Sequence, residues 1–361
     1  MPSPLIDLIA REAASRPLTL ARYMDLALQH PEYGYYRHVD PLGKAGDFIT
    51  APEISQIFGE LLGLWCADLW QKLGAPAEFL LLELGPGRGT MMADALRATR
   101  NVLGFHAAIR LGLLESNEAL RSAQAEKLAA WQPQWFPHLQ NLPSIPSIIL
   151  ANEFFDALPI RQFVRAAAGW QERCIGAVSG KLSWLMMPPD PTIALLLTPA
   201  QQALPLGAYA EVSPAAQHMM QHCVQHVRRH GGALLAIDYG YAQPAGSNTF
   251  QAVTAHSYQD PLAQPGEADL TAHVNFDALA TVAGSLEAQA WQLLEQGAFL
   301  QRLGIAQRID GLAASADDAQ KEMIRSACQR LTAPEAMGRL FKVLCVTGTS
   351  AICPAGWESG L

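Results

Sequence analysis

Residues 83–90 of the chain (ELGPGRGT) have the composition and spacing of a loop that binds a small ligand. Glycines at 85, 87 and 89 allow tight turns and a close approach of the backbone to a bound molecule. This G-x-G-x-G spacing differs from the G-x-G-x-x-G of dinucleotide-binding loops and from the P-loop of nucleoside triphosphatases. The loop therefore disfavours an NAD-dependent dehydrogenase.

Glu83, two residues before the first glycine, suits a cationic ligand better than a pyrophosphate. S-adenosylmethionine (SAM) carries a sulfonium and an ammonium group, so we expect Glu83 to pair with its methionine end. The alternative is a plain glycine turn beside a surface glutamate. With SAM as the ligand, the loop contacts would come from a short stretch: Gly85, Pro86, Gly87 and Gly89.

Glu115 follows the second expected strand, a point from which a carboxylate can accept both ribose hydroxyls of a nucleotide. Ser116, next along the chain, is expected to cap the following helix and to border the ligand. The alternative for Glu115 is a carboxylate that interacts favourably with a helix N-terminus.

A third group of polar residues lies in residues 151–159 (ANEFFDALP), directly after the apolar run 147–151. Asn152, Glu153 and Asp156 would emerge at the carboxyl end of that strand, where doubly wound folds bind ligands. Two carboxylates three residues apart, among phenylalanines, could hold a guanidinium by charge-assisted hydrogen bonds. The alternative is capping of a short helix.

The elements that must position these residues alternate between strand and helix. Short apolar runs at 79–84, 108–115, 147–151 and 233–237 predict buried parallel strands. Helices are expected at 52–73, 90–103, from 116, and at 214–230, 275–283, 295–303 and 317–331, with a last strand at 341–346. The pattern predicts an α/β fold with a mostly parallel, doubly wound sheet. Runs at 161–165, 172–175 and 182–185, with turns at Gly169 and Gly180, predict an inserted antiparallel segment.

Several blocks together resemble the MidA family of SAM-dependent methyltransferases. They are residues 46–55 (GDFITAPEIS), the glycine loop, 114–124, 151–159, 237–240 (IDYG), 269–276 (DLTAHVNF) and 296–300 (QGAFL). The resemblance covers nearly the whole chain. It implies a class I, Rossmann-like methyltransferase fold, with SAM as cofactor and S-adenosylhomocysteine as product. The expected division is an N-terminal helical extension at 1–75 and a methyltransferase domain at 76–361, with an insertion at about 160–210.

The resemblance also implies roles for further residues and a class of acceptor. Gly46 and Thr50 would lie near the methionine carboxylate, with Asp47 nearby, and Asn152 would join the cofactor site. His273 could face the acceptor. The eukaryotic member of the family methylates an arginine of a respiratory complex I subunit, so a protein arginine is the expected acceptor, with Glu153 and Asp156 acting on one guanidinium. A small-molecule O-methyltransferase and a non-catalytic SAM-binding assembly factor are the alternatives.

The composition of the chain narrows the classes of protein and of binding partner that remain. The formal charge of −8 disfavours a nucleic-acid partner, and no apolar run reaches the ~18 residues of a membrane helix. No signal peptide is evident and the six cysteines form no CxxC pair, so we expect a cytoplasmic protein without a metal centre. The histidines at 218, 222, 226 and 230 repeat at helical spacing, which is more typical of a solvated face than of a zinc site. The oligomeric state is not predicted.

Overall fold

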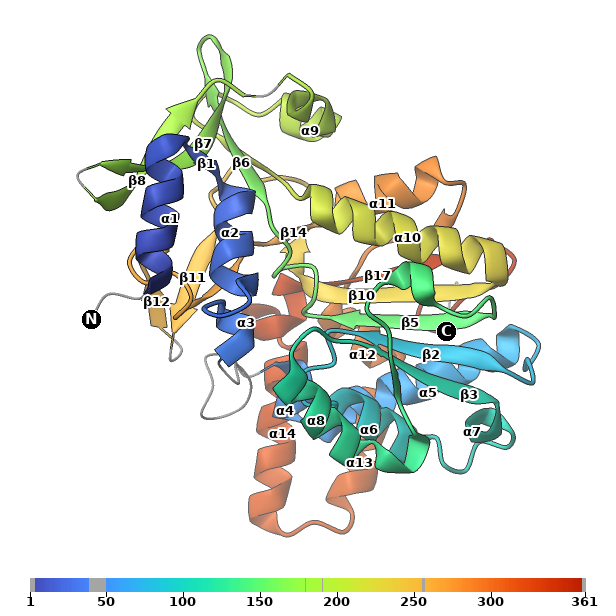
Figure 1. The fold of residues 1–361 in the computed structure, drawn as a ribbon. Coiled ribbons are helices and arrows are strands. Elements are labelled where there is room, and N and C mark those ends of the chain that lie inside the picture. The colour runs from blue at the N-terminus through green and yellow to red at the C-terminus, as the bar shows by residue number, and fades with distance from the viewer. Residues whose placement is uncertain (1–3, 39–49, 179, 190, 255–256, 359–361) are drawn as a thin grey trace. The chain divides into compact units, whose positions relative to one another are not determined.

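The computed structural model describes residues 4–38, 50–178, 180–189, 191–254 and 257–358 (Figure 1). The chain divides into two units. The insert unit comprises Met1–Phe48, Phe155–Met219 and Tyr241–Leu279, and the sheet unit comprises Ile49–Phe154, Met220–Gly240 and Ala280–Leu361. Residues 1–75, expected to form one N-terminal extension, are thus shared between the two units, and residues 160–210, the expected insertion, lie in the insert unit.

The sheet unit is built on a mostly parallel sheet, as the alternating pattern predicts. Its strands follow the order β15-β17-β10-β5-β2-β3-β4. Neighbours from β10 to β4 run parallel, and β17 runs antiparallel to β10 and also pairs with β15 and β16. The bounds are β2 Phe79–Leu84, β3 Ile109–Leu114, β4 Gln134–Trp135, β5 Ser147–Asn152, β10 Gly232–Tyr241, β15 Gln289–Ala290, β16 Leu294–Glu295 and β17 Phe341–Thr347.

Helices cover both faces of this sheet: α5, α6 and α13 lie on one side and residues 220–230 of α10 on the other (Figure 1). Helices α5 and α6 approach closely, because a Cβ atom on Gly63 would lie 2.4 Å from the Ala95 carbonyl oxygen. The helices of this unit are α4 Ala51–Ile54, α5 Gln56–Lys72, α6 Thr90–Ala98, α7 Phe105–Ala108, α8 Glu118–Lys127, η1 Ala129–Trp131, η2 Leu139–Asn141, α12 Gln296–Arg302, α13 Ile305–Ala313, α14 Asp318–Thr332 and η4 Pro334–Gly338.

Three local expectations about these helices were wrong. The helix expected at 52–73 is broken at Ser55, which is extended (φ −158°) and whose hydroxyl caps α5 by accepting from Ile57 N at 3.3 Å. The helix expected at 90–103 ends at Ala98. Asn117, not Ser116, caps α8, because its Oδ1 accepts from the N–H groups of the first turn. Helix α13 was not predicted.

The insert unit holds the antiparallel segment that the sequence predicts. Its main sheet has the order β1-β7-β6-β9, with β8 paired to β7, and a smaller sheet has the order β12-β11-β13. Gly180, with φ +78°, lies at the β7–β8 turn. The elements are α1 Pro4–Ser15, β1 Leu18–Thr19, α2 Leu20–Gln29, α3 Tyr35–His38, β6 Arg161–Ala166, β7 Gly169–Val178, β8 Lys181–Met187, η3 Ile193–Leu196, α9 Pro199–Gln202, β9 Tyr209–Val212, β11 Gln251–Thr254, β12 Ser257–Gln259, β13 Asp269–Thr271 and β14 Val274–Asn275.

Two helices, α10 Pro214–His230 and α11 Phe276–Ser285, contribute residues to both units. Each unit has its own buried apolar cluster, one packed against the central strands β2, β5 and β10 and one among α1, α2 and the smaller sheet. In the part of the chain that the structure describes, no helix has the length and apolar character needed to cross a bilayer.

Candidate active site

The glycine loop joins the end of β2 to the start of α6, and its conformation explains its composition. Gly85, Gly87 and Gly89 have φ values of +62°, +53° and +73°, a region that L side chains rarely adopt. A Cβ atom on Gly85 would also lie 3.0 Å from the ring of Phe154. The backbone of the loop is tied to β3 by a hydrogen bond from Gly85 N to Leu114 O at 3.0 Å. A larger residue at any of these glycines would therefore strain the loop.

Glu83 and Asn152 place unpaired acceptors at the carboxyl ends of the neighbouring strands β2 and β5. Glu83 is 3% exposed and Asn152 is 9% exposed. Within the described residues, Glu83 Oε2 and Asn152 Oδ1 have no hydrogen-bond partner. Burial, and secondarily the charge of Glu115, raises the pKa of Glu83 to about 8. Buried acceptors without partners are costly, so this edge of the sheet suits a ligand that brings N–H donors and positive charge.

Glu115 follows β3 and is held beside the glycine loop by Gln124 of α8. Its Oε1 accepts from Asn117 N at 2.8 Å, and its Oε2 accepts from Gln124 Nε2 at 3.3 Å. Gln124 Nε2 also donates to Gly87 O at 2.6 Å, and its Oε1 accepts from Trp135 Nε1 at 2.8 Å. Burial raises the pKa of Glu115, and these hydrogen bonds oppose that rise. Gln124 is fully buried and links the loop to the carboxylate.

Glu153 belongs to the sheet unit and contacts the N-terminus of α4. Its Oε1 accepts from Ala51 N at 3.0 Å and from Asn152 Nδ2 at 3.3 Å. Its φ of +48° is uncommon outside glycine and marks local strain at the end of β5. The Thr50 side chain, at the N-cap position of α4, makes no cap hydrogen bond, and Glu153 supplies a cap instead.

Helix α4 is also tied to the first residue of α6. Thr90 Oγ1 donates to Glu53 Oε1 at 2.7 Å, and Lys127 Nζ donates to Thr90 Oγ1 at 2.8 Å. Glu153, α4 and the end of the glycine loop therefore form one connected structure. Gly46 and Asp47, expected near the cofactor, lie outside the described residues. Pro86 lies within the loop, where its carbonyl accepts from Gly89 N at 2.7 Å, and Ser116 is exposed.

Asp156 and His273 belong to the insert unit. The chain passes from the sheet unit to the insert unit between Phe154 and Phe155. Asp156 is 6% exposed, and its backbone carbonyl accepts from Ala272 N at 3.1 Å. Nearby, Tyr36 OH donates to Asp269 Oδ1 at 2.8 Å. Burial, followed by the charges of Asp269 and Asp156, holds the pKa of Tyr36 well above its ordinary value. Asp156 thus shares an acidic environment with Asp269, the first residue of the block 269–276, to which the sequence assigned no role.

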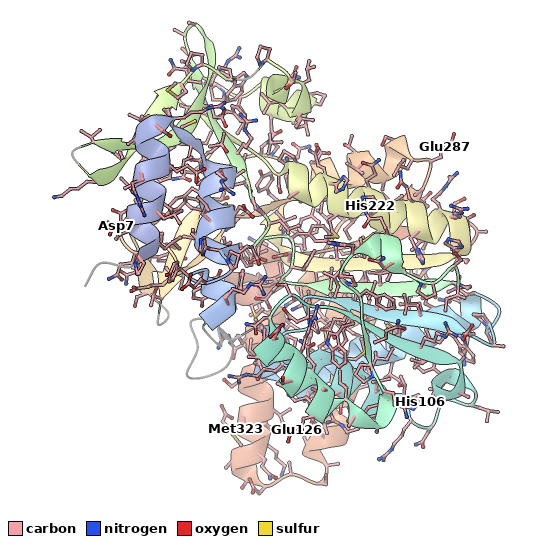
Figure 2. The ribbon with its side chains drawn as sticks, in the orientation of Figure 1. Asp7, His106, Glu126, His222, Glu287 and Met323 are labelled. Atoms are coloured by element: carbon pink, nitrogen blue, oxygen red, sulfur yellow. The ribbon has the colours of Figure 1, made fainter. Side chains whose placement is uncertain are left out.

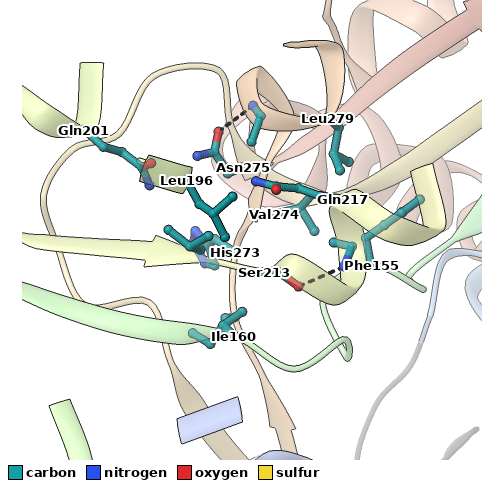
Figure 3. Close-up of a pocket in the computed structure, with 14 residues that line it drawn as sticks. Phe155, Ile160, Leu196, Gln201, Ser213, Gln217, His273, Val274, Asn275 and Leu279 are labelled. Atoms are coloured by element: carbon teal, nitrogen blue, oxygen red, sulfur yellow. Dashed lines mark hydrogen bonds between the residues drawn. The ribbon is translucent and has the colours of Figure 1, made fainter. Parts of the chain in front are cut away.

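His273 lines a pocket of the insert unit (Figure 3). Its backbone N–H donates to Thr249 Oγ1 at 2.9 Å, and the Thr249 hydroxyl in turn donates to the buried carboxylate of Glu211. Burial lowers the pKa of the His273 imidazole, which favours its neutral form. Glu211 and Thr249 support this residue, and no motif in the sequence pointed to either of them.

The histidine stripe on α10 makes local contacts with the sheet unit. A ring nitrogen of His222 (Figure 2) lies 2.9 Å from Gln140 Nε2, and one of His226 lies 2.8 Å from Ser147 Oγ. Burial, and then the nearby His230, lowers the pKa of His226 to about 4. Among the described residues, no group of three or more His, Cys, Asp or Glu side chains is arranged to hold a metal ion.

Comparisons with known proteins agree on a class of enzyme. A family model described as "Putative S-adenosyl-L-methionine-dependent methyltransferase" matches residues 61–293. Protein arginine methyltransferase NDUFAF7, mitochondrial, from Danio rerio is 34% identical over 97% of this chain and 88% of its own length. The human protein of that name is 33% identical over 93% and 81%.

A solved structure covers the whole chain. A Burkholderia thailandensis protein, crystallised with S-adenosyl-homocysteine, superposes with a TM-score of 0.85 at 26% identity, over 100% of this chain and 98% of that one. The expected cytoplasmic location is contradicted by the curated relatives, which are named as mitochondrial proteins.

Proposed function

The chain belongs to the MidA family of SAM-dependent methyltransferases, with the class I fold of that family, and we propose that it methylates an arginine of a protein substrate. The relatives that share a third of its sequence are named protein arginine methyltransferases. The observation that carries the proposal is the buried Asp156, whose surroundings in the insert unit include a second carboxylate, Asp269. A guanidinium cation is an acceptor that such surroundings favour.

The residues of the sheet unit fit the cofactor. The unpaired Glu83 Oε2 and Asn152 Oδ1 would accept hydrogen bonds from its ammonium group. Glu115 would accept from the ribose hydroxyls, next to Ser116, while the backbone of the loop from Gly85 to Gly89 would lie against it. Thr50 and Gly46 remain proposed neighbours of its carboxylate. When bound, the cofactor supplies an electrophilic methyl group on a sulfonium.

The chain's own contribution to the reaction is positioning and charge. A protonated guanidinium is a poor nucleophile, so one nitrogen must be oriented with its lone pair toward the methyl group. Asp156 would bind the other nitrogens and stabilise the single positive charge that stays on the guanidinium once the methylated nitrogen has released its proton. Such orientation can supply on the order of 7–11 kcal/mol. Glu153, which contacts Ala51, would act on the same site through α4 and the loop, and His273 would line the acceptor side.

The proposal is tested with radiolabelled SAM and a lysate from a strain that lacks the protein. Wild-type enzyme should label a protein band, and mass spectrometry of that band should place the methyl group on arginine. The Asp156→Asn variant keeps the side-chain shape and should bind SAM but label the band far more slowly. Label on a carboxyl or phenolic oxygen would instead identify an O-methyltransferase, and SAM binding without any transfer would identify a non-catalytic assembly factor.

A further inference from the structure

The insert unit contains a pocket with largely apolar walls (Figure 3). Phe155, Ile160 and Leu196 contribute to one part of the lining, and Val274 and Leu279 to another. Two small residues, Ala216 and Ala278, also line it. The cavity has a volume of about 30 Å³. One water molecule needs roughly 10–15 Å³ by such a measure, so the space suits a small group and not a large ring.

Most polar groups of the lining already have partners within the fold. Asn275 Oδ1 accepts from Ala278 N at 3.1 Å, and Ser213 Oγ accepts from Ala216 N at 3.1 Å (Figure 3). Gln201 uses both ends of its amide, because its Oε1 accepts from Thr198 N and its Nε2 donates to Glu211 O. Gln217 differs, because its side-chain amide has no hydrogen-bond partner in the described chain and extends toward Asn275 (Figure 3). The Gln217 amide can therefore form hydrogen bonds with a polar group of a bound substrate, such as a peptide bond.

The lining excludes a charged occupant. The described residues around the pocket include no aspartate, glutamate, lysine or arginine, and burial favours the neutral form of His273. A guanidinium in this space would lose its hydration without gaining a counter-ion, which is strongly unfavourable. The arginine to be methylated therefore does not enter the pocket, whereas a small apolar side chain would be stabilised there by removal from water.

The pocket wall is joined to the proposed acceptor residue through the backbone. Phe155 lines it and Asp156 is the next residue along the chain. The Asp156 carbonyl accepts from Ala272 N at 3.1 Å, and Ala272, His273 and Val274 are successive residues of the lining. One piece of backbone thus carries both the carboxylate and the pocket wall. A peptide whose arginine reaches Asp156 would bring a neighbouring residue to the pocket.

We infer that this pocket selects a small apolar side chain, of alanine or valine size, beside the acceptor arginine, and that the Gln217 amide binds the adjoining peptide backbone. The inference rests on the proposed arginine acceptor. Because each methylene in an apolar pocket changes selectivity by roughly 10–200-fold, the size of this side chain should be a main determinant of substrate choice.

Two opposite variants and a peptide series test the inference. The peptides carry one arginine, with glycine, alanine, valine or leucine placed before or after it. On one side of the arginine, wild-type enzyme should methylate the alanine or valine peptide at least about ten times more efficiently, as kcat/KM, than the glycine and leucine peptides. Ala216→Val fills the pocket and should remove that preference. Leu279→Ala enlarges it and should shift the preference toward leucine.

Ala319→Val, on an exposed part of α14, is the matched control and should leave the preference unchanged. SAM affinity should be the same in all variants, since none of these residues lies in the glycine loop. If Leu279→Ala fails to fold, the loss of the size preference in Ala216→Val is the test of the pocket's role. Equal methylation of all arginine peptides by wild type and both variants would overturn the pocket's role while leaving the proposed function intact. No methylation of any arginine peptide, with label found on another acceptor, would overturn the proposed function itself.

Discussion

The carboxylate of Glu153 accepts a hydrogen bond from the backbone N–H of Ala51 at 3.0 Å. Glu153 ends β5 in a left-handed conformation, and Ala51 opens α4, which is itself tied to the start of α6 through Glu53 and Thr90. A helix N-terminus favours a negative charge at this position. Glu153 therefore connects the strand that precedes the proposed acceptor residue to the elements around the glycine loop.

Gly87→Val should abolish SAM binding without unfolding the protein. Gly87 has φ +53°, so valine strains the loop backbone and adds bulk where the ligand is proposed to lie. Gly74→Val is the matched control, because Gly74 has φ +87° with open space around it in the same unit. Both variants should lower Tm, and calorimetry should show loss of SAM affinity for Gly87→Val alone. Equal affinity in the two variants would remove the loop from the cofactor site.

Glu115→Ala should weaken SAM binding by roughly 1.5–3 kcal/mol, the range for hydrogen bonds to a charged group. The physical reason is that two ribose hydroxyls lose their acceptor. Glu118→Ala, an exposed carboxylate in the first turn of α8, serves as the control and should bind normally. Isothermal titration calorimetry measures the SAM affinity of both variants. If Glu115→Ala binds SAM as tightly as the wild type, Glu115 does not contact the cofactor and serves only to bind Asn117 and Gln124.

Glu83 should make SAM binding and stability depend on pH in opposite ways. Its pKa is about 8 in the folded protein and near 4.5 when exposed, so folding favours the protonated carboxyl. Without ligand, its contribution to stability is present at low pH and is lost as pH rises from about 4.5 to about 8. SAM affinity should instead rise over the upper part of this range, because the carboxylate form pairs with the ammonium group.

The variant Glu83→Gln isolates these two effects. Relative to wild type, it should gain stability as the pH is raised toward 8 and beyond, and it should lose the pH dependence of SAM binding. Denaturant unfolding without ligand and calorimetry with SAM, each repeated across pH, supply the two readouts. If the SAM affinity of the wild-type protein does not change with pH, Glu83 does not contact the cofactor.

Asp156→Asn should lower kcat with little change in SAM affinity, because the lost charge is proposed to face the acceptor. Loss of such a group commonly removes several kcal/mol of transition-state stabilisation. Glu153→Gln keeps an oxygen for Ala51 N and should have a smaller effect on kcat, whereas Glu153→Ala should also lower Tm. Because both residues are proposed to act on one acceptor site, a double variant carrying Asp156→Asn and Glu153→Gln should be little worse than the worse single variant. Additive effects on kcat would instead assign the two carboxylates to separate groups.

Local patterns in the sequence were sufficient for the class of fold and for the conformation of the glycine loop. The apolar run 79–84, the alternating glycines and the helix after Thr90 predicted a strand, a loop and a helix that the structure confirms. The turns at Gly169 and Gly180 were predicted for the same reason. Backbone sterics act within a few residues, so glycine spacing and apolar periodicity carry this information without any knowledge of distant contacts.

The tertiary structure decided how these residues are connected. Gln124 of α8 joins the loop to Glu115 although it lies 37 residues beyond Gly87, and Asp269 accepts a hydrogen bond from Tyr36 across a still larger separation in sequence. Glu153 and Asp156 are three residues apart, yet they belong to different units. Such pairings depend on which surfaces pack together and on which buried polar groups must find partners. Sequence spacing alone does not determine either, and so the residues that support the proposed site became evident in the fold.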